Sequence, residues 1–250
     1  MMTLDTIALA GTPHLAPLSD TLDAGELVGI IGPNGAGKST LLSLLSGYRT
    51  PTMGQIVIDG VPLTSIHLEV LARQRALVAQ REAEGFDWQV RDYLMLGNAL
   101  DDSHQCSVLA TQLELTNFLS RHLHTLSGGE RQRISIARAL CQLRLLDTPG
   151  PTTRLLLLDE PTSALDIEQQ QKLMRLLIKL TRQYGLTVVC VLHDLSLAAT
   201  YCHRLWLMDK GVRIAAGHVH EVTQPHIIAN AFDADVTIDP IRSDILHLTP

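Results

Sequence analysis

The sequence predicts an α/β fold that combines a mostly parallel sheet with an antiparallel β subdomain and an inserted helical subdomain. Residues 1–25 alternate apolar positions with turn residues, which favours antiparallel strands. From about residue 81 to 150, amphipathic segments replace the β-branched runs, which favours helices. Apolar runs typical of strands buried on both faces occur at 26–31, 155–158 and 187–192. We therefore expect one domain with a core formed by 1–80 and 151–250 and a helical subdomain at 81–150.

The first half of the core is expected to contain a strand, a loop, a helix and two more strands. The run 26–31 leads into a glycine-rich loop, and Leu41 to Leu45 then predict the first turns of a helix. A further strand is expected at 55–60, where it ends in a turn. A buried strand is expected at 77–80, and it ends at Gln80.

The second half returns to alternating strands and helices. A core-facing helix is predicted by apolar residues at i, i+3, i+4, i+7 and i+11, which are Leu173, Leu176, Leu177, Leu180 and Tyr184. Gly185 is the expected C-cap of this helix. The segments 205–208 and 212–215 flank Asp209-Lys210-Gly211 and predict a β-hairpin.

The glycine-rich loop after the first buried run fits the phosphate-binding pattern G-x-x-x-x-G-K-[ST]. It consists of Gly32, Pro33, Asn34, Gly35, Ala36, Gly37, Lys38, Ser39 and Thr40. Its glycines allow the backbone N–H groups to turn toward phosphate oxygens, and the following helix adds a partial positive charge. We expect a nucleoside triphosphate site in which Lys38 reaches the β- and γ-phosphates and Ser39 binds Mg²⁺.

Two carboxylates follow the apolar run at 155–158 and can complete this site. Asp159 is the expected second ligand of Mg²⁺, and Glu160 is placed to polarise an attacking water as general base. Without the phosphate-binding loop, the same pair would be an ordinary acidic junction between a strand and a loop.

A second glycine pair precedes a predicted helix, in the segment Leu126, Ser127, Gly128, Gly129 and Glu130. A helix N-terminus of this kind can bind an anion. One chain has no use for two such sites on one triphosphate, but a head-to-tail dimer has, because the second motif can close over the partner's γ-phosphate. Taken alone, the segment also fits a plain loop with a serine N-cap.

These motifs resemble those of ABC-transporter ATPase subunits, and the resemblance covers essentially the whole chain in family order. Residues 126–130 resemble the family's signature sequence, and Gln80 stands where its Q-loop glutamine lies. The segment Ser163, Ala164, Leu165 and Asp166 resembles the D-loop that contacts the opposite subunit. His193 resembles the switch histidine that senses the γ-phosphate.

The resemblance implies a RecA-like P-loop NTPase core, the cofactors ATP and Mg²⁺, and a role for each motif. Glu160, His193 and Gln80 would be catalytic, and Mg²⁺ would be bound by Ser39, Gln80 and Asp159. The signature would bind the partner's ATP. The implied partners are a second copy of the chain, two copies of a transmembrane permease subunit and, indirectly, a periplasmic substrate-binding protein.

Within the family the chain most resembles the ATPase subunits that energise vitamin B12 (cobalamin) import at the cytoplasmic face of the bacterial inner membrane. Three features suggest this: the short N-terminal stretch, Tyr93-Leu94-Met95-Leu96 after the Q-loop, and the Pro/Gly/Thr insertion before 155–160. Haem and ferric-siderophore importers share much of this pattern and are the alternative. Phe86 and Trp88 either form the groove for the permease or pack within the helical subdomain.

Other classes fit the chain less well. A soluble ABC-type ATPase of DNA repair or translation would usually carry long coiled-coil insertions or two cassettes, and this chain has neither. A P-loop kinase or GTPase would lack the segment 126–130. The net charge of −6 and the absence of a basic stripe argue against nucleic acid as a partner. No apolar run approaches the roughly 20 residues needed to span a bilayer.

Two expectations concern side chains outside these motifs. The family usually places an aromatic ring upstream of the loop to stack on adenine, but Leu9 to Pro13 offer only aliphatic contact, and His14 fits a solvated loop residue. The pairs His122/His124 and His218/His220 have no further ligand nearby in the sequence, so no metal site is expected at either pair.

Overall fold

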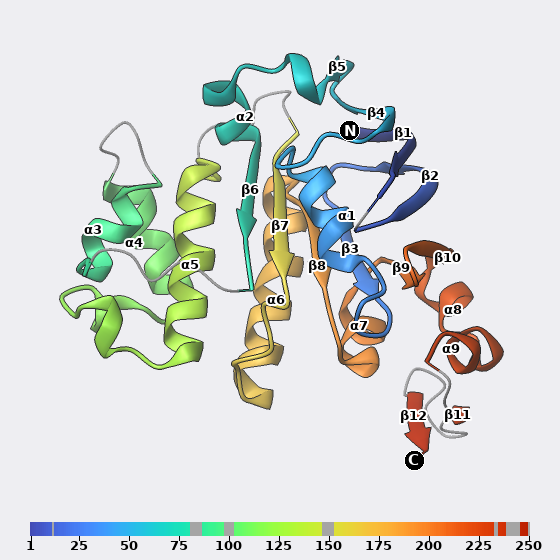
Figure 1. Ribbon diagram of the computed structural model, residues 1–250. Helices are drawn as coiled ribbons and strands as arrows, with labels where there is room; N and C mark the ends of the chain where they lie inside the picture. The colour runs from blue at the N-terminus through green and yellow to red at the C-terminus, as the bar shows by residue number, and fades with distance from the viewer. Residues whose placement is uncertain are drawn as a thin grey trace.

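The computed structural model describes residues 1–11, 13–80, 87–97, 103–146, 153–232, 235–238 and 246–249. Its largest sheet has six strands in the order β10-β9-β3-β8-β7-β6 (Figure 1). These strands are β3 (Leu27–Ile31), β6 (Arg75–Val78), β7 (Leu155–Asp159), β8 (Thr187–Val191), β9 (Arg204–Asp209) and β10 (Val212–His218). All neighbouring pairs are parallel except the hairpin β9-β10. The predicted parallel sheet and its terminal hairpin are therefore confirmed.

A second, antiparallel sheet has the order β2-β1-β4-β5. It consists of β1 (Met2–Leu9), β2 (Leu15–Leu22), β4 (Met53–Ile58) and β5 (Val61–Pro62). The antiparallel subdomain predicted from 1–25 is confirmed. The helix α2 (Leu68–Gln74) and the short 3-10 turn η1 (Leu63–Ser65) before it were not predicted. Leu71 is the only buried residue of α2, so its sequence carries no apolar stripe.

The central strands β3, β8 and β7 are apolar at nearly every position because both of their faces are covered. Leu156, Leu158 and Cys190 belong to one hydrophobic cluster, and Leu155 and Leu157 belong to the other. The first cluster includes α6 (Ile167–Tyr184) and α7 (Leu195–Tyr201), and the second includes α1 (Lys38–Leu45) and the antiparallel sheet. Successive residues of a strand point to opposite faces, so each run supplies both cores.

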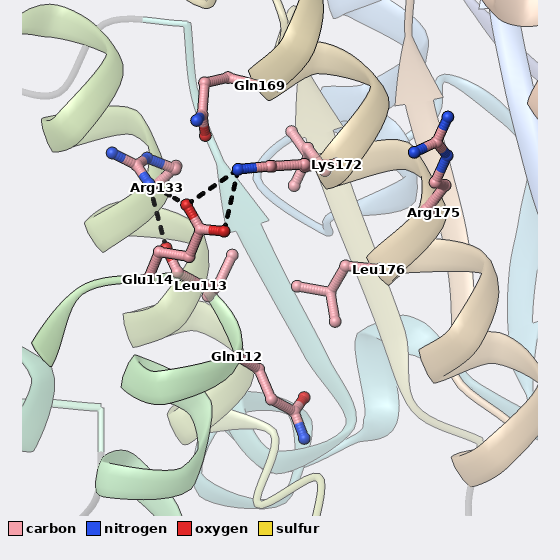
Figure 2. A pocket seen from close by; sticks show the side chains of 9 residues that line it. Gln112, Leu113, Glu114, Arg133, Gln169, Lys172, Arg175 and Leu176 are labelled. Carbon is pink, nitrogen blue, oxygen red and sulfur yellow. Dashed lines mark hydrogen bonds and ion pairs between the residues drawn. The ribbon is translucent and has the colours of Figure 1, made fainter.

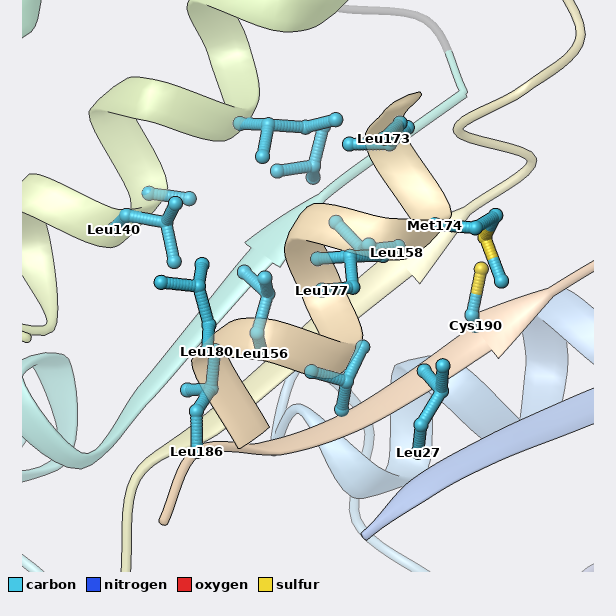
Figure 3. Packing of buried hydrophobic residues seen from close by; sticks show 14 of the residues in the cluster. Leu27, Leu140, Leu156, Leu158, Leu173, Met174, Leu177, Leu180, Leu186 and Cys190 are labelled. Atoms are coloured by element: carbon cyan, nitrogen blue, oxygen red, sulfur yellow. The ribbon is translucent and has the colours of Figure 1, made fainter. Parts of the chain in front are cut away.

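Figure 3 shows how α6 covers its face of the sheet. Leu173, Met174, Leu177 and Leu180 are at most 3% exposed and pack over Leu156 and Leu158. Each such side chain contributes roughly 1.5–3 kcal/mol through burial. As predicted, the helix ends at Gly185, whose φ of 64° lies in the left-handed region.

The helical subdomain lies beside this core (Figure 1, green). It contains α3 (Val90–Met95), α4 (Ser103–Gln112), η2 (Thr116–Phe118), η3 (Leu123–Thr125) and α5 (Gly128–Gln142). Leu109, Ile134 and Leu140 are buried in the same cluster as α6. The predicted limits of this subdomain fall at 81–86 and 147–152, which lie outside the described residues.

The chain ends in α8 (Val219–Val222), α9 (Pro225–Phe232) and a small antiparallel pair, β11 (Asp235–Ile238) and β12 (Leu246–Thr249). Among the described residues, no helix has the length and apolar character that would let it cross a membrane.

Candidate active site

The phosphate-binding loop connects β3 to α1, as the sequence predicts. A Cβ atom at Gly32 would overlap the carbonyl oxygen of Met208, so only glycine fits there. Gly37 is the N-cap of α1, with a φ of 95° and no side-chain cap. The first N–H groups of a helix have no intrahelical acceptor. The N-terminus of α1 is therefore available to an anion.

A cavity of about 500 Å³ opens over this loop. It is lined by Pro13, His14, the loop residues 34–40, Glu160, Lys210 and Gly211. Lys38 is only 6% exposed, and its Nζ donates to the carbonyl oxygens of Gly32 and Pro33 at 2.8 and 2.9 Å. Burial lowers the pKa of Lys38, and the negative charges of Glu160 and Asp159 oppose that shift. The amine thus lies folded against its own loop, at the edge of the cavity.

Three neighbouring parallel strands bring the remaining predicted residues together. Gln80 follows β6, Asp159 ends β7 with Glu160 directly after it, and His193 follows β8. Carboxyl ends of parallel strands meet at one edge of a sheet, where ligands of α/β proteins bind. This edge is the one that faces the phosphate-binding loop.

Glu160 is held by two of these residues. Gln80 donates from Nε2 to one carboxylate oxygen of Glu160 at 2.6 Å, and Nε2 of His193 lies 2.6 Å from the other. Glu160 has a φ of 52°, a left-handed conformation that is unusual for a residue other than glycine. Such backbone strain is frequent at functional sites. Both carboxylate oxygens of the predicted base therefore have a polar neighbour in this structure.

Asp159 and Ser39 offer oxygen ligands of the kind that Mg²⁺ prefers. The Ser39 hydroxyl donates to Oδ1 of Asp159 at 3.2 Å. Burial raises the pKa of Asp159, while the hydrogen bond from Ser39 works against this shift. A buried carboxylate of raised pKa gains from a nearby cation, so the pair fits the predicted metal. Gln80, the third predicted ligand, contacts Glu160 here.

The signature segment begins α5 with a capping box. The Ser127 hydroxyl accepts from the N–H of Glu130 at 3.3 Å, and a Glu130 carboxylate oxygen accepts from the N–H of Ser127 at 2.7 Å. The hydrogen bond from the backbone N–H of Ser127 holds the pKa of Glu130 below its ordinary value, against the cost of desolvation. The serine N-cap considered as an alternative is thus present. It does not exclude ligand binding by the glycine amides that follow.

The predicted D-loop lies against the signature in the same chain. A cavity of about 340 Å³ is lined by Ser127–Glu130, Arg133, Ala164–Asp166 and Gln169. Asp166 caps α6 by accepting from the N–H of Gln169 at 2.9 Å. This cavity and the one over the phosphate-binding loop share no lining residue. A single chain therefore does not bring the two glycine-rich motifs onto one ligand.

Beside the signature lies a further cavity of about 230 Å³, between the end of α4, α5 and α6 (Figure 2). Glu114 lies 3.0 Å from Lys172 of α6 and 3.9 Å from Arg133 of α5. Arg133 also donates to the carbonyl oxygen of Leu113 at 3.2 Å. These contacts join the signature helix to the core helix α6.

The expectation about the adenine region needs a correction. Leu9 is 8% exposed and belongs to the hydrophobic cluster of the antiparallel sheet, so it offers no contact to a nucleotide. Of the stretch from Leu9 to His14, only Pro13 and His14 line the cavity, and Thr12 lies outside the described residues. His14 is exposed, but it stands at the cavity rather than away from it.

Comparison with known proteins decides the family. The family model described as ABC transporter matches residues 15–163. The curated hemin import ATP-binding protein HmuV of Enterobacter cloacae is 44% identical over 237 residues, covering 93% of this chain and 90% of the relative. The chain belongs to the ABC transporter family. It is an ABC transporter ATPase, in which ATP hydrolysis drives transport.

Solved structures agree with this assignment. An inward-facing metal-chelate type ABC transporter matches with a TM-score of 0.78 at 25% identity, covering 100% of this chain and 96% of that chain. The dimeric structure of the bacterial ABC transporter cassette MJ0796 matches with a TM-score of 0.73 at 26% identity, covering 88% and 99%. The predicted fold class is therefore confirmed, and the kinase and GTPase alternatives are excluded.

The expected cargo is not supported. The sequence analysis favoured a vitamin B12 importer, whereas the relative above is a hemin import protein. The alternative of a haem importer is thus better supported than the main prediction. Of the three features quoted for vitamin B12, the Pro/Gly/Thr insertion lies outside the described residues.

Proposed function

We propose that this chain is the ATPase subunit of a haem importer, working at the cytoplasmic face of the bacterial inner membrane. The observation that carries the proposal is the 44% identity to a hemin import ATP-binding protein over nearly the whole chain. The match to a metal-chelate type transporter supports the same class of cargo. The proposed partners are two permease subunits, a second copy of this chain and, indirectly, a periplasmic substrate-binding protein.

In this proposal the phosphate-binding loop of one copy holds the triphosphate of ATP. The glycine amides and the uncapped N-terminus of α1 donate to phosphate oxygens. Lys38 exchanges the carbonyl oxygens of Gly32 and Pro33 for the β- and γ-phosphates. Ser39 and Asp159, together with Gln80, would hold Mg²⁺, which when bound neutralises charge on the β- and γ-phosphate oxygens.

Glu160 is the proposed general base. Each of its oxygens has one polar neighbour here, Gln80 or His193, and loss of either contact would leave the carboxylate more available to a water molecule. Because Gln80 and His193 follow two different strands, a ligand that draws either side chain away would free the carboxylate. In this proposal, nucleotide binding therefore makes the base more accessible to the attacking water.

The second copy completes the site in this proposal. Ser127 to Glu130 of the partner would close over the γ-phosphate, with Ser163 to Asp166 alongside. Two features support a head-to-tail pair: the signature cavity is separate from the phosphate-binding cavity of its own chain, and a similar cassette has been solved as a dimer.

The mechanism is tested with Glu160→Gln. The carboxamide keeps the size of the side chain but cannot take a proton, and removing a general base typically costs about 10²–10⁴-fold in rate. We expect ATP binding to persist, turnover to stop and an ATP-bound dimer to accumulate on a sizing column. Continued turnover with only monomer in the presence of ATP would show that Glu160 is not the base.

The cargo is tested by complementation. Cells that lack the ATPase subunit of a haem importer, and others that lack that of a vitamin B12 importer, each receive this chain. We expect growth on haem as iron source to be restored and cobalamin uptake not to be, with Lys38→Ala as the inactive control. Rescue of cobalamin uptake alone would overturn haem as the cargo but would leave the ATPase assignment standing.

A further inference from the structure

We propose that Asp87, His122 and His124 form a binding site for a divalent transition-metal ion, with Zn²⁺ as the best-fitting ion. The site lies in the helical subdomain, and none of its residues lines the cavity over the phosphate-binding loop. One ligand atom from each residue lies within 4.8 Å of the other two. Of the part of the chain that the structure describes, this is the one group with three such ligands.

The carboxylate of Asp87 stands between the two imidazoles. Nδ1 of His122 is 3.0 Å from Oδ2, and Nδ1 of His124 is 2.6 Å from Oδ1. Zn²⁺ binds nitrogen and oxygen at about 2.0–2.2 Å, so ligand atoms in a tetrahedral site are about 3.3 Å apart. A shift of the ligand atoms by less than about 1 Å would therefore admit the ion.

The backbone fixes these three residues relative to one another. The N–H of Leu123 donates to the carbonyl oxygen of Trp88 at 3.0 Å, and the N–H of Val90 donates to that of Arg121 at 2.9 Å. Gln89 and His122 form an antiparallel bridge. Two short segments are thus paired with the ligands already on one side, which lowers the entropy cost of binding an ion.

The donor set selects the class of ion. Two imidazole nitrogens with one carboxylate suit Zn²⁺ and its first-row neighbours rather than Mg²⁺ or Ca²⁺, which prefer oxygen ligands. The side chains of His122 and His124 are 43% and 66% exposed, so the group lies at the surface, where water could supply a fourth ligand. Three protein ligands with water in the fourth position are a usual arrangement for Zn²⁺.

Bound metal would act on the segment that leads into the signature. Thr125 follows His124 directly and bonds to the carbonyl oxygen of His122 through its hydroxyl at 2.7 Å. The next residues are Leu126 and the N-cap Ser127 of α5. An ion at this site would therefore tie residues 87–90 to the start of the signature helix.

His218 and His220 provide a matched comparison within the chain. They have the same spacing as His122 and His124, and their rings stack with centroids 6.0 Å apart, close to the 5.8 Å of the first pair. They belong to no three-ligand group among the described residues. The difference between the pairs is the carboxylate, which the fold supplies from a distant position in the sequence.

The experiment is a titration of the untagged full-length chain with Zn²⁺, and with Co²⁺ as an optical probe, in the absence of nucleotide. Asp87→Asn and His124→Gln are compared with wild type, and His220→Gln is the matched control. Carboxylates near the phosphate-binding loop can also bind metal. The readout is therefore the number of Zn²⁺ sites per chain in each variant compared with that in wild type. Mg-ATP turnover without added Zn²⁺ confirms that each variant is folded.

We expect each of the two site variants to lose one Zn²⁺ site per chain, or at least tenfold in its affinity, together with the visible band of tetrahedral Co²⁺. The control should bind as wild type does. Equal stoichiometry and affinity in wild type, Asp87→Asn and His124→Gln would overturn the proposal. Loss of the Co²⁺ band in His220→Gln alone would also overturn it, because the ion would then lie elsewhere.

Discussion

Two helix N-termini preceded by glycine-rich segments differ in how their first N–H groups are used. The helix α1 after the phosphate-binding loop has Gly37 as N-cap and no side-chain cap. The helix α5 of the signature is closed by a capping box from Ser127 and Glu130. An uncapped N-terminus offers its donors to an anion, whereas a capped one has already satisfied two of them with its own side chains.

The charged groups around the two helix N-termini differ as well. The first has a buried cation in Lys38 and two nearby carboxylates, Asp159 and Glu160, all from one chain. The second places its own carboxylate, Glu130, at the N-terminus of the helix, and its cavity is lined by the D-loop. These differences agree with the proposal that the first N-terminus holds the triphosphate and that the second completes the site of another copy.

The largest expected effect comes from the phosphate-binding side of this comparison. Lys38→Ala removes the side-chain cation of the loop, so turnover should fall to background while the fold stays intact. Loss of its two hydrogen bonds to the loop costs roughly 1.5–3 kcal/mol of stability each, and removal of a desolvated ammonium offsets part of this loss. The measurement is ATP binding and ATPase rate in the purified complex.

Lys210→Ala is the matched control for this variant, because Lys210 lines the same cavity but its side chain is 90% exposed. The turnover of Lys210→Ala should stay within about threefold of wild type, because solvent screens an exposed charge and its interactions are weak. Near-normal ATPase activity in Lys38→Ala would contradict the assignment of residues 32–40 as the phosphate-binding loop.

The signature side should respond differently to substitution. Ser127→Arg places a bulky charge at the N-terminus of α5, so we expect turnover to drop at least tenfold while ATP binding to the isolated chain is unchanged. In a mixed dimer with a Lys38→Ala subunit, one site combines the altered phosphate-binding loop with the altered signature. The other site combines the two unaltered motifs. Mixing the two inactive proteins should therefore restore ATPase activity. No recovery at any mixing ratio would count against the head-to-tail arrangement.

A moderate effect, on thermal stability, is expected from substitution of Asp159, the carboxylate beside the phosphate-binding loop. Because burial raises the pKa of Asp159 above its ordinary value of 3.8, its ionised form destabilises the folded chain. Asp159→Asn should raise the Tm of the nucleotide-free protein while abolishing turnover. Thermal unfolding without nucleotide is the measurement.

The sign of the pH dependence follows from the same shift. The destabilisation by Asp159 is complete above its raised pKa and vanishes as the pH falls through the ordinary value of 3.8, where both states are protonated. The increase in Tm of Asp159→Asn over wild type should therefore be present at pH 7 and become smaller at acidic pH. A lower Tm for Asp159→Asn at pH 7 would mean that the carboxylate is stabilised by the fold.

The smallest effect concerns the base of the nucleotide. A stacked aromatic ring would be worth roughly 1–3 kcal/mol, or about ten- to hundredfold in affinity. His14 is exposed at the cavity rim, so we expect weak ATP binding, little preference over GTP, and a change below about threefold in His14→Ala. Leu9 is buried and Ala10 does not line the cavity, so a tyrosine at either position should not tighten nucleotide binding.

Competition between ATP and GTP on wild type and His14→Ala decides this point. A strong preference for ATP that persists in His14→Ala would show that another residue binds the adenine.

The sequence by itself determined the features that are local in the chain. The phosphate-binding loop, the capping box at Ser127 and the C-cap at Gly185 each depend on a few adjacent residues whose backbone preferences act independently of the rest. The apolar runs also fixed the central strands, because both faces of each strand had to be covered. The family motifs followed from the same short segments.

Only the tertiary structure decided which distant side chains meet. Gln80 is 80 residues from Glu160, yet the order β6-β7-β8 places it and His193 on the same carboxylate. The same reason explains Asp87, which lies 37 residues from His124 and bonds to it. A sequence gives the spacing along the chain, but strand order and the pairing of short segments set the distance in space. For that reason neither the occupied base nor the third metal ligand was predicted.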